Sequence, residues 1–207
     1  MKTIDPNTWN RRAHYELFKN YRDPFFNVCF DLDLTAFLAR IKAEGKPFFL
    51  SFTRVATAAA NAVEAFRLRL RGDAVVLHET CRPSFTMMTD KGVFRFLTVP
   101  YHEDEATFIA TAERLSEIAR KSVSVADEPG VDDLYFITSM PWVSFTAVEH
   151  AMPGNPDDSF PRLTWGKYRD VLGRTLIPFS VAAHHALVDG QDVGAFAETM
   201  QRLLDRV

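Results

Sequence analysis

Residues 184–190 read His184-His185-Ala186-Leu187-Val188-Asp189-Gly190, and they join a predicted strand to a predicted helix. The strand is the apolar run at 176–183, and the helix is the amphipathic segment at 193–204. A histidine at the end of a strand is well placed to face a cleft, and a neutral imidazole accepts a proton near pH 7. Gly190 permits a backbone turn that is closed to other residues. The segment therefore predicts a general base on a strand-to-helix turn.

The same segment has a plainer interpretation as a structural turn, because most buried histidines are simply hydrogen-bonded. Asp189 would be ionised and could pin the turn through a cation. A metal site is disfavoured, since adjacent histidines on a strand point to opposite faces and no third ligand lies at a diagnostic spacing. We therefore expect no metal.

Outward from this turn, predicted strands and helices mix without strict alternation. Strands are expected at 26–33, 74–78, 84–89, 93–99, 134–139, 162–168 and 175–183. Helices are expected at 8–20, 34–44, 48–69, 103–124 and 193–204, with Thr8 capping the first and Gly72-Asp73 ending the third. A turn is expected at Asp90-Lys91-Gly92, and loops at 126–133 and 152–158. This order favours an α/β two-layer sandwich, a mixed, largely antiparallel sheet packed with helices, over a doubly wound parallel fold.

Composition places the chain among globular proteins. It has 207 residues, of which 47% are apolar and 25% are charged, and this balance excludes a disordered chain. No segment has the composition of an interdomain linker, so residues 1–207 are expected to form a single domain. Eighteen Phe, five Tyr and three Trp residues suit a large core, extensive interfaces and apolar pockets.

Charge and cysteine content disfavour several other classes of protein. The net charge of −3 gives no electrostatic reason to expect a nucleic-acid partner. No apolar run reaches the roughly 20 residues that span a bilayer, and the first residues lack the apolar core of a signal peptide. Cys29 and Cys81 do not make a disulfide framework. We therefore expect a cytoplasmic protein without nucleic-acid or membrane partners.

Five segments in order, spread over nearly the whole chain, resemble the chloramphenicol acetyltransferase family of the trimeric, His-His-Ala-x-x-Asp-Gly type. Besides residues 184–190, they are Thr8–Tyr15 (TWNRRAHY), Leu32–Thr35 (LDLT), Pro141–Phe145 (PWVSF) and Leu163–Tyr168 (LTWGKY). The resemblance implies the fold of CoA-dependent acyltransferases and O-acetylation of a small-molecule alcohol, with acetyl-CoA as co-substrate. It further implies a homotrimer with sites between subunits, chloramphenicol as the best-supported acceptor, and a role in antibiotic resistance.

The resemblance also implies catalytic roles for individual residues. His185 would be the general base that takes the proton of the acceptor hydroxyl, which attacks the thioester directly without an acyl-enzyme. The oxyanion donor would be Thr138 or its neighbour Ser139, of which strand alternation lets one face the site, and we favour Thr138. Thr164 would help to hold a water near the intermediate. Without the resemblance, each hydroxyl would be interpreted as an ordinary strand residue.

The supporting residues of the site follow in the same way. Asp189 and Arg11 match a pair that holds the turn carrying the base in this family, although a surface position for Arg11 is the plainer alternative. In the acceptor pocket, Phe18 replaces a usual Tyr, while Phe26 and Phe94 keep expected aromatics. Arg22 falls where an apolar residue is common, and this substitution would favour a more polar alcohol than chloramphenicol. A solvent-facing Arg22 is the plainer alternative.

Two further alternatives stay open at this stage. The acyltransferase core of 2-oxo acid dehydrogenase complexes shares a His-x-x-x-Asp-Gly end motif, but the chain shows no lipoyl domain and no Pro/Ala-rich linker. A non-catalytic ligand-binding protein of the same fold would have lost turnover, which the retention of His185, Asp189 and Thr138 argues against.

Overall fold

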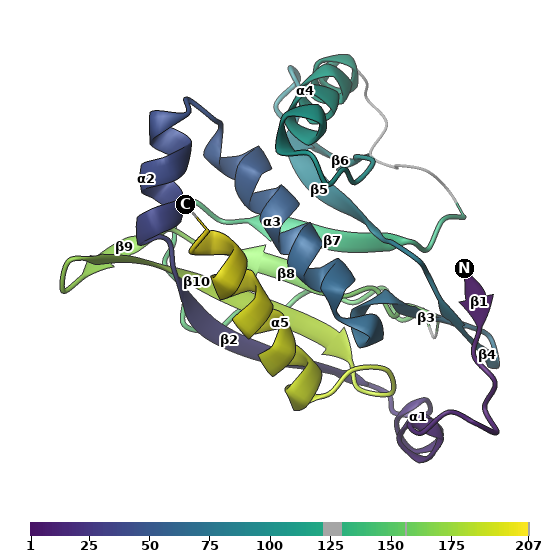
Figure 1. Ribbon diagram of the computed structural model, residues 1–207. Coiled ribbons are helices and arrows are strands. Elements are labelled where there is room, and N and C mark those ends of the chain that lie inside the picture. Colours follow the sequence, from purple (N-terminus) through teal and green to yellow (C-terminus); the bar gives the residue numbers. More distant parts are fainter. Residues whose placement is uncertain (122–129, 156, 207) are drawn as a thin grey trace.

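A seven-stranded sheet forms the middle of the computed structural model, which describes residues 1–121, 130–155 and 157–206 (Figure 1). The strands lie in the order β2 (Phe25–Asp33), β10 (Arg174–His184), β8 (Arg162–Trp165), β7 (Leu134–Ser139), β5 (Arg82–Met88) and β6 (Phe94–Thr98), with β9 (Arg169–Val171) paired to β10. β7 runs parallel to β5 and β8. The pairs of β10 with β2, β8 and β9, and of β5 with β6, are antiparallel. The prediction of a mixed, largely antiparallel sheet is confirmed.

The strand prediction is wrong at one place in this sheet. The strand expected at 162–168 ends at Trp165, and the short strand β9 follows it as half of a hairpin with β10. All of β9 is exposed, so it lacks the alternation of apolar and polar residues that marks a half-buried strand. The turn of this hairpin contains Leu172 and Gly173, both at positive φ.

A small second sheet corrects the helix expected at 48–69. The helix α3 ends at Ala62, a 3-10 turn spans Glu64–Arg67, and residues 68–71 form a strand. The sheet has the order β1 (Lys2–Thr3), β4 (Ala74–Leu77) and β3 (Leu68–Arg71). Gly72 adopts φ +56° and lets β3 and β4 form a hairpin, so Gly72-Asp73 is a strand turn and not a helix end.

The helices are α1 (Arg12–Phe18), α2 (Thr35–Ala43), α3 (Phe48–Ala62), α4 (Glu105–Arg120) and α5 (Gly190–Leu204). In Figure 1, α3 and α5 lie side by side across one face of the large sheet, as their mutual contacts require. The first helix is shorter than predicted, because Thr8 donates to the Asp5 carbonyl at 3.3 Å in a turn instead of capping. Asp104 caps α4. The end of the helix predicted at 103–124 lies partly outside the described residues, as do parts of the predicted loops at 126–133 and 152–158.

The two faces of the large sheet differ in chemistry. On the helix-covered face, Phe52 of α3 packs edge-on against Trp165 with ring centroids 5.0 Å apart, and Trp165 stacks on Phe179. Because side chains alternate along a strand, the neighbours Thr164 and Ser180 point to the opposite face. The loop after β7 covers that opposite face, where the Asn27 side chain donates to the Val148 carbonyl. No helix among the described residues is long and apolar enough to cross a membrane.

Candidate active site

The turn 184–190 is held by contacts at both of its ends. Asp189 caps α5 by accepting from the backbone N–H groups of Gln191 at 2.9 Å and Asp192 at 3.3 Å, and Asp192 accepts from the Asp189 N–H in return. Such a capping box fixes the direction in which the chain enters the helix. The capping box therefore fixes the backbone conformation of the turn between β10 and α5.

The cation that pins this turn is the guanidinium of Arg11. Its Nη1 lies 2.5 Å from Asp189 Oδ2, and its Nη2 donates to the His185 carbonyl at 3.5 Å. Partial burial works to raise the pKa of Asp189, but the hydrogen bond and charge of Arg11, together with the backbone N–H groups of Asp192 and Gln191, outweigh it and the pKa is lowered. The structure thus brings together the supporting pair that the sequence predicts.

Asp189→Asn is expected to lower the free energy of unfolding by about 1.5–3 kcal/mol, since the amide keeps the helix cap but loses a charged hydrogen bond. Thermal unfolding checks this, with Asp31→Asn as the matched control. Asp31 pairs with Arg169 at a site where both side chains are well exposed, so its loss should cost at most about 1 kcal/mol. Unchanged melting of Asp189→Asn beside a large loss of rate would place Asp189 in the chemistry instead.

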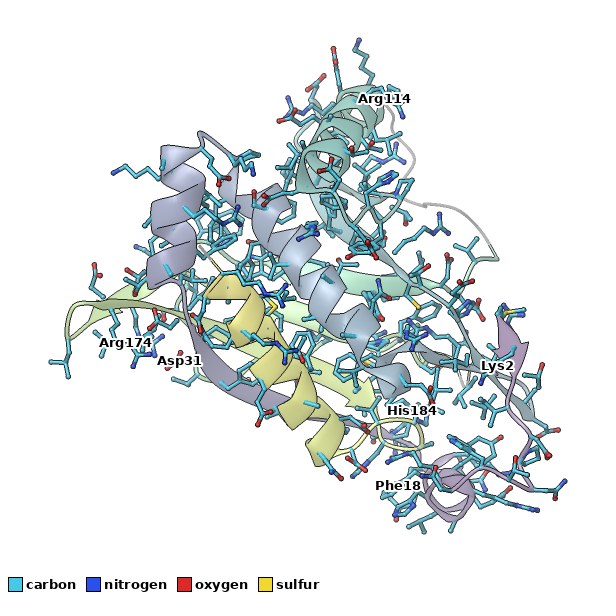
Figure 2. All side chains as sticks on the ribbon, in the orientation of Figure 1. Lys2, Phe18, Asp31, Arg114, Arg174 and His184 are labelled. Atoms are coloured by element: carbon cyan, nitrogen blue, oxygen red, sulfur yellow. The ribbon has the colours of Figure 1, made fainter. Side chains whose placement is uncertain are left out.

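His185 is oriented by its ring nitrogen and by two aromatic neighbours. Its Nδ1 lies 3.1 Å from the Val188 carbonyl oxygen, which can only accept, so Nδ1 carries the proton of the neutral ring. The ring stacks on Phe18 at 4.2 Å and tilts against Phe26 at 4.6 Å. Phe18 on α1 and the end of β10 lie at the same corner of the molecule (Figure 2). Among the residues that the structure describes, none hydrogen-bonds Nε2, so its lone pair is available to an incoming proton.

His184 faces the opposite way and is almost completely buried. Its Nδ1 accepts from the Ala186 backbone N–H at 3.2 Å, and its ring meets Phe25 edge-on. Burial lowers the pKa of His184 to about 4; the charge of Asp158 opposes this shift and that of His185 adds to it. His184 is therefore neutral at physiological pH, with its proton on Nε2.

The low pKa of His184 predicts an acid-sensitive fold. The unfolded imidazole takes up a proton near pH 6.5 and the folded one only near pH 4, so stability falls as the pH drops through that window. The loss attributable to His184 approaches about 3 kcal/mol. His184→Asn keeps an acceptor for the Ala186 N–H, and it should flatten the decline of the melting temperature between pH 6.5 and 4. Parallel pH profiles of the two proteins would contradict this.

The sheet register separates the two candidate oxyanion donors. Thr138 is paired with Thr164 on β8, and Ser139 with Trp165. Thr138 therefore shares the face of Thr164 and Ser180, whereas Ser139 shares the helix-covered face of Trp165. Thr164 is fully buried, and its hydroxyl lies 3.0 Å from Nε2 of His150.

A cavity of about 720 Å³ lies between the chain that enters β2, the loop after β7 and the end of β10. Of the predicted acceptor residues, Arg22 and Phe26 line it. Phe18 borders the same corner through its stacking on His185. Phe94 is about half exposed on β6 and lies against Phe96, so this chain alone does not bring it to the cavity.

Several polar residues of the cavity escape sequence-based prediction, His150 and Asp158 among them. His150 and Asp158 lie in a loop without periodicity, and His184 is interpreted from sequence only as the neighbour of the base. The only sequence feature that points to them is the presence of His150 and Asp158 in the loop that directly precedes the buried strand β8. Among the described residues, no group of three or more His, Cys, Asp or Glu is arranged to hold a metal ion.

Within one chain, the predicted base and the predicted oxyanion donor are far apart. Ser180 is in register with Thr164 and hence with Thr138, and His185 follows five residues further along the chain. His185 and Thr138 are therefore separated by about 17 Å along the strand direction. They are also two strand spacings, about 10 Å, apart across the sheet. A single acyl centre needs both groups within hydrogen-bond reach. One chain therefore does not complete a site that uses both residues.

The fold of this chain is matched by solved structures over nearly its whole length. A solved chloramphenicol acetyltransferase has a TM-score of 0.86 and 24% identity, covering 98% of this chain and 99% of its own. The cubic core of the pyruvate dehydrogenase multienzyme complex has a TM-score of 0.65 and 19% identity, covering 95% of this chain and 86% of its own. At these identities the likeness shows the shared fold alone.

The family is shown by sequence. The family model described as chloramphenicol acetyltransferase matches residues 1–201, and this chain belongs to that family. The chloramphenicol acetyltransferase of Escherichia coli is 27% identical over 205 residues, which cover 98% of this chain and 93% of the relative. The chloramphenicol acetyltransferase of Streptomyces acrimycini is 30% identical over 205 residues, which cover 97% of this chain and 93% of the relative. The resemblance stated from five segments is thereby confirmed.

Proposed function

We propose that this chain transfers the acetyl group of acetyl-CoA to a hydroxyl of chloramphenicol, with His185 as the general base. The observation that carries the proposal is the orientation of His185, because its Nδ1 proton is bound to the Val188 carbonyl and Nε2 is left to accept. Nε2 takes the proton of the acceptor hydroxyl while the oxygen attacks the thioester carbon. The tetrahedral intermediate then expels the CoA thiolate, which recovers the proton from His185. The products are an acetyl ester and free CoA.

The negative oxygen of the intermediate needs a hydrogen-bond donor. We assign this role to Thr138, since its hydroxyl shares the polar face of the sheet with Thr164, whereas Ser139 shares the face that the helices cover. Thr164 stands beside it as a second hydroxyl on the same face. Its bond to His150 supports a role in orienting polar groups next to the intermediate.

The distance between His185 and Thr138 supports an active site built by two copies of the chain. His185 lies at the sheet end beside α1, and Thr138 lies two strands away towards the sheet centre. A base from one subunit that meets the polar face of the next would complete the centre. We therefore propose the homotrimer with sites between subunits, and a biological role in antibiotic resistance.

The test is thiol release from acetyl-CoA by the purified protein, with chloramphenicol as acceptor. Release that requires chloramphenicol would support the proposed reaction. Release with another alcohol only would keep the mechanism and change the acceptor. Binding of acetyl-CoA without release to any acceptor would contradict the proposal and favour a ligand-binding protein.

A further inference from the structure

The cavity beside β10 has apolar walls and a polar floor. The apolar walls come from Phe25, Phe26, Val148, Met152 and Ala182. We define the polar floor as His150, Asp158 and His184, which line the same cavity. Apolar walls hold the body of a ligand, and a few placed polar groups decide which ligand fits.

His150 offers the cavity a hydrogen-bonding nitrogen. Its Nε2 lies 3.0 Å from the Thr164 hydroxyl, and its Nδ1 has no hydrogen-bond partner within the described ranges. Burial and the nearby charge of Arg162 both lower the pKa of His150, so the ring is neutral. Because Thr164 holds one nitrogen, the ring has a fixed orientation, and the other nitrogen is available to a ligand.

Asp158 adds a buried ion pair to the same floor. Only 5% of the residue is exposed, and its Oδ2 accepts from Arg162 Nη2 at 2.6 Å. Its Oδ1 is buried and has no hydrogen-bond partner among the residues that the structure describes. Because Oδ1 is covered by protein atoms, Asp158 acts at the floor through its ion pair with Arg162 and not as a free acceptor.

The charges of the floor cancel. The Asp158 carboxylate is balanced by Arg162, and both His150 and His184 are neutral. His184 also keeps its Nε2 proton for donation, since Nδ1 is used by the Ala186 N–H.

The rest of the lining carries two cations, Lys19 and Arg22, and two anions, Asp23 and Glu149, so it favours neither sign by number. At the floor itself, polar groups without net charge suit a neutral hydroxyl, which donates and accepts, better than an ammonium or a carboxylate.

We propose that His150 is a specificity-determining residue that hydrogen-bonds a second hydroxyl of the acceptor. The cavity then selects alcohols that combine an apolar body with more than one hydroxyl over alcohols with a single hydroxyl. This inference rests on the proposed function for the identity of the ligand as the acetyl acceptor.

The experiment measures equilibrium binding by calorimetry in the absence of acetyl-CoA. The probes are p-nitrophenyl propanol with one terminal hydroxyl, the corresponding propanediol, and the corresponding aminopropanediol. The protein is expected to bind the diol about tenfold more tightly than the propanol, which corresponds to one good hydrogen bond. His150→Leu should abolish that preference, and His150→Gln should restore part of it. His102→Leu, which changes a histidine outside the cavity in the same way, should keep it in full.

Several results would overturn the inference. They are equal binding of the two alcohols by the unaltered protein, full preference in His150→Leu, an equal loss in His102→Leu, and a stronger preference for the aminopropanediol. If His150→Leu does not fold, His150→Gln carries the test, and it should weaken diol binding relative to propanol. Thiol release from acetyl-CoA is measured in parallel. A diol preference that depends on His150, without thiol release, would refute the proposed function and leave the binding inference standing.

Discussion

His185→Ala is expected to reduce acetyl transfer at least about a hundredfold while the protein stays folded. The imidazole has its Nδ1 committed to the Val188 carbonyl, so Nε2 is its proton acceptor, and alanine leaves nothing to take the proton of the acceptor hydroxyl. Burial of His185 is partial, and its ring packs against Phe18 and Phe26 at the surface of the sheet end. Its removal should therefore cost rate far more than stability.

The measurement is kcat/KM from thiol release with chloramphenicol and acetyl-CoA, beside a thermal unfolding curve. His102→Ala serves as the histidine control and should retain full activity. Near-normal turnover by folded His185→Ala would show that another group is the base. Loss of activity together with loss of the folding transition would leave the base to be tested with His185→Gln, which preserves bulk and polarity without accepting a proton near neutral pH.

Thr138→Ala is expected to lower kcat by about 10²–10³, the usual effect of removing one oxyanion donor. Ser139→Ala is the matched control, because it removes a hydroxyl from the next position of the same strand but from the helix-covered face. It should leave kcat within a few-fold of the unaltered protein. A large effect of Ser139→Ala with a small effect of Thr138→Ala would exchange the two assignments.

The two deficient variants also test the subunit arrangement when they are combined. If the base and the donor of one centre come from different copies, mixed oligomers of His185→Ala and Thr138→Ala contain some centres with both groups intact. Co-expression of the variants should then restore activity that neither shows alone. Failure to restore any activity in verified mixed oligomers would contradict a centre shared between copies.

The sequence predicts the strands, turn and helix of the candidate site more completely than it predicts the cavity beside them. The strand at 134–139 and the strand, turn and helix around 184–190 follow from apolar runs with clear ends, and the structure confirms them. The pair of Arg11 with Asp189 follows from family resemblance alone, since nothing local to either residue indicates a partner so distant in sequence.

What escapes prediction depends on register and on competing local signals. The helix expected at 48–69 extends too far because its apolar run continues smoothly into Leu68 and Leu70, which instead alternate along a strand. The choice between Thr138 and Ser139 requires the pairing with β8, which one strand alone does not contain. His150 and Asp158 lie in a loop, and no periodicity assigns a loop residue to a cavity.

The contact between Arg11 and Asp189 closes a loop of 178 residues, and it therefore also orders events during folding. Its two partners are 178 residues apart, so the clamp cannot form until residue 189 has been synthesised. Closure of so long a loop has a large entropic cost that neighbouring contacts must first offset. A chain that loses its first dozen residues to proteolysis keeps every strand of the large sheet but loses the cation that holds the turn 184–190. Activity should therefore disappear before secondary structure does when the N-terminal segment is cut.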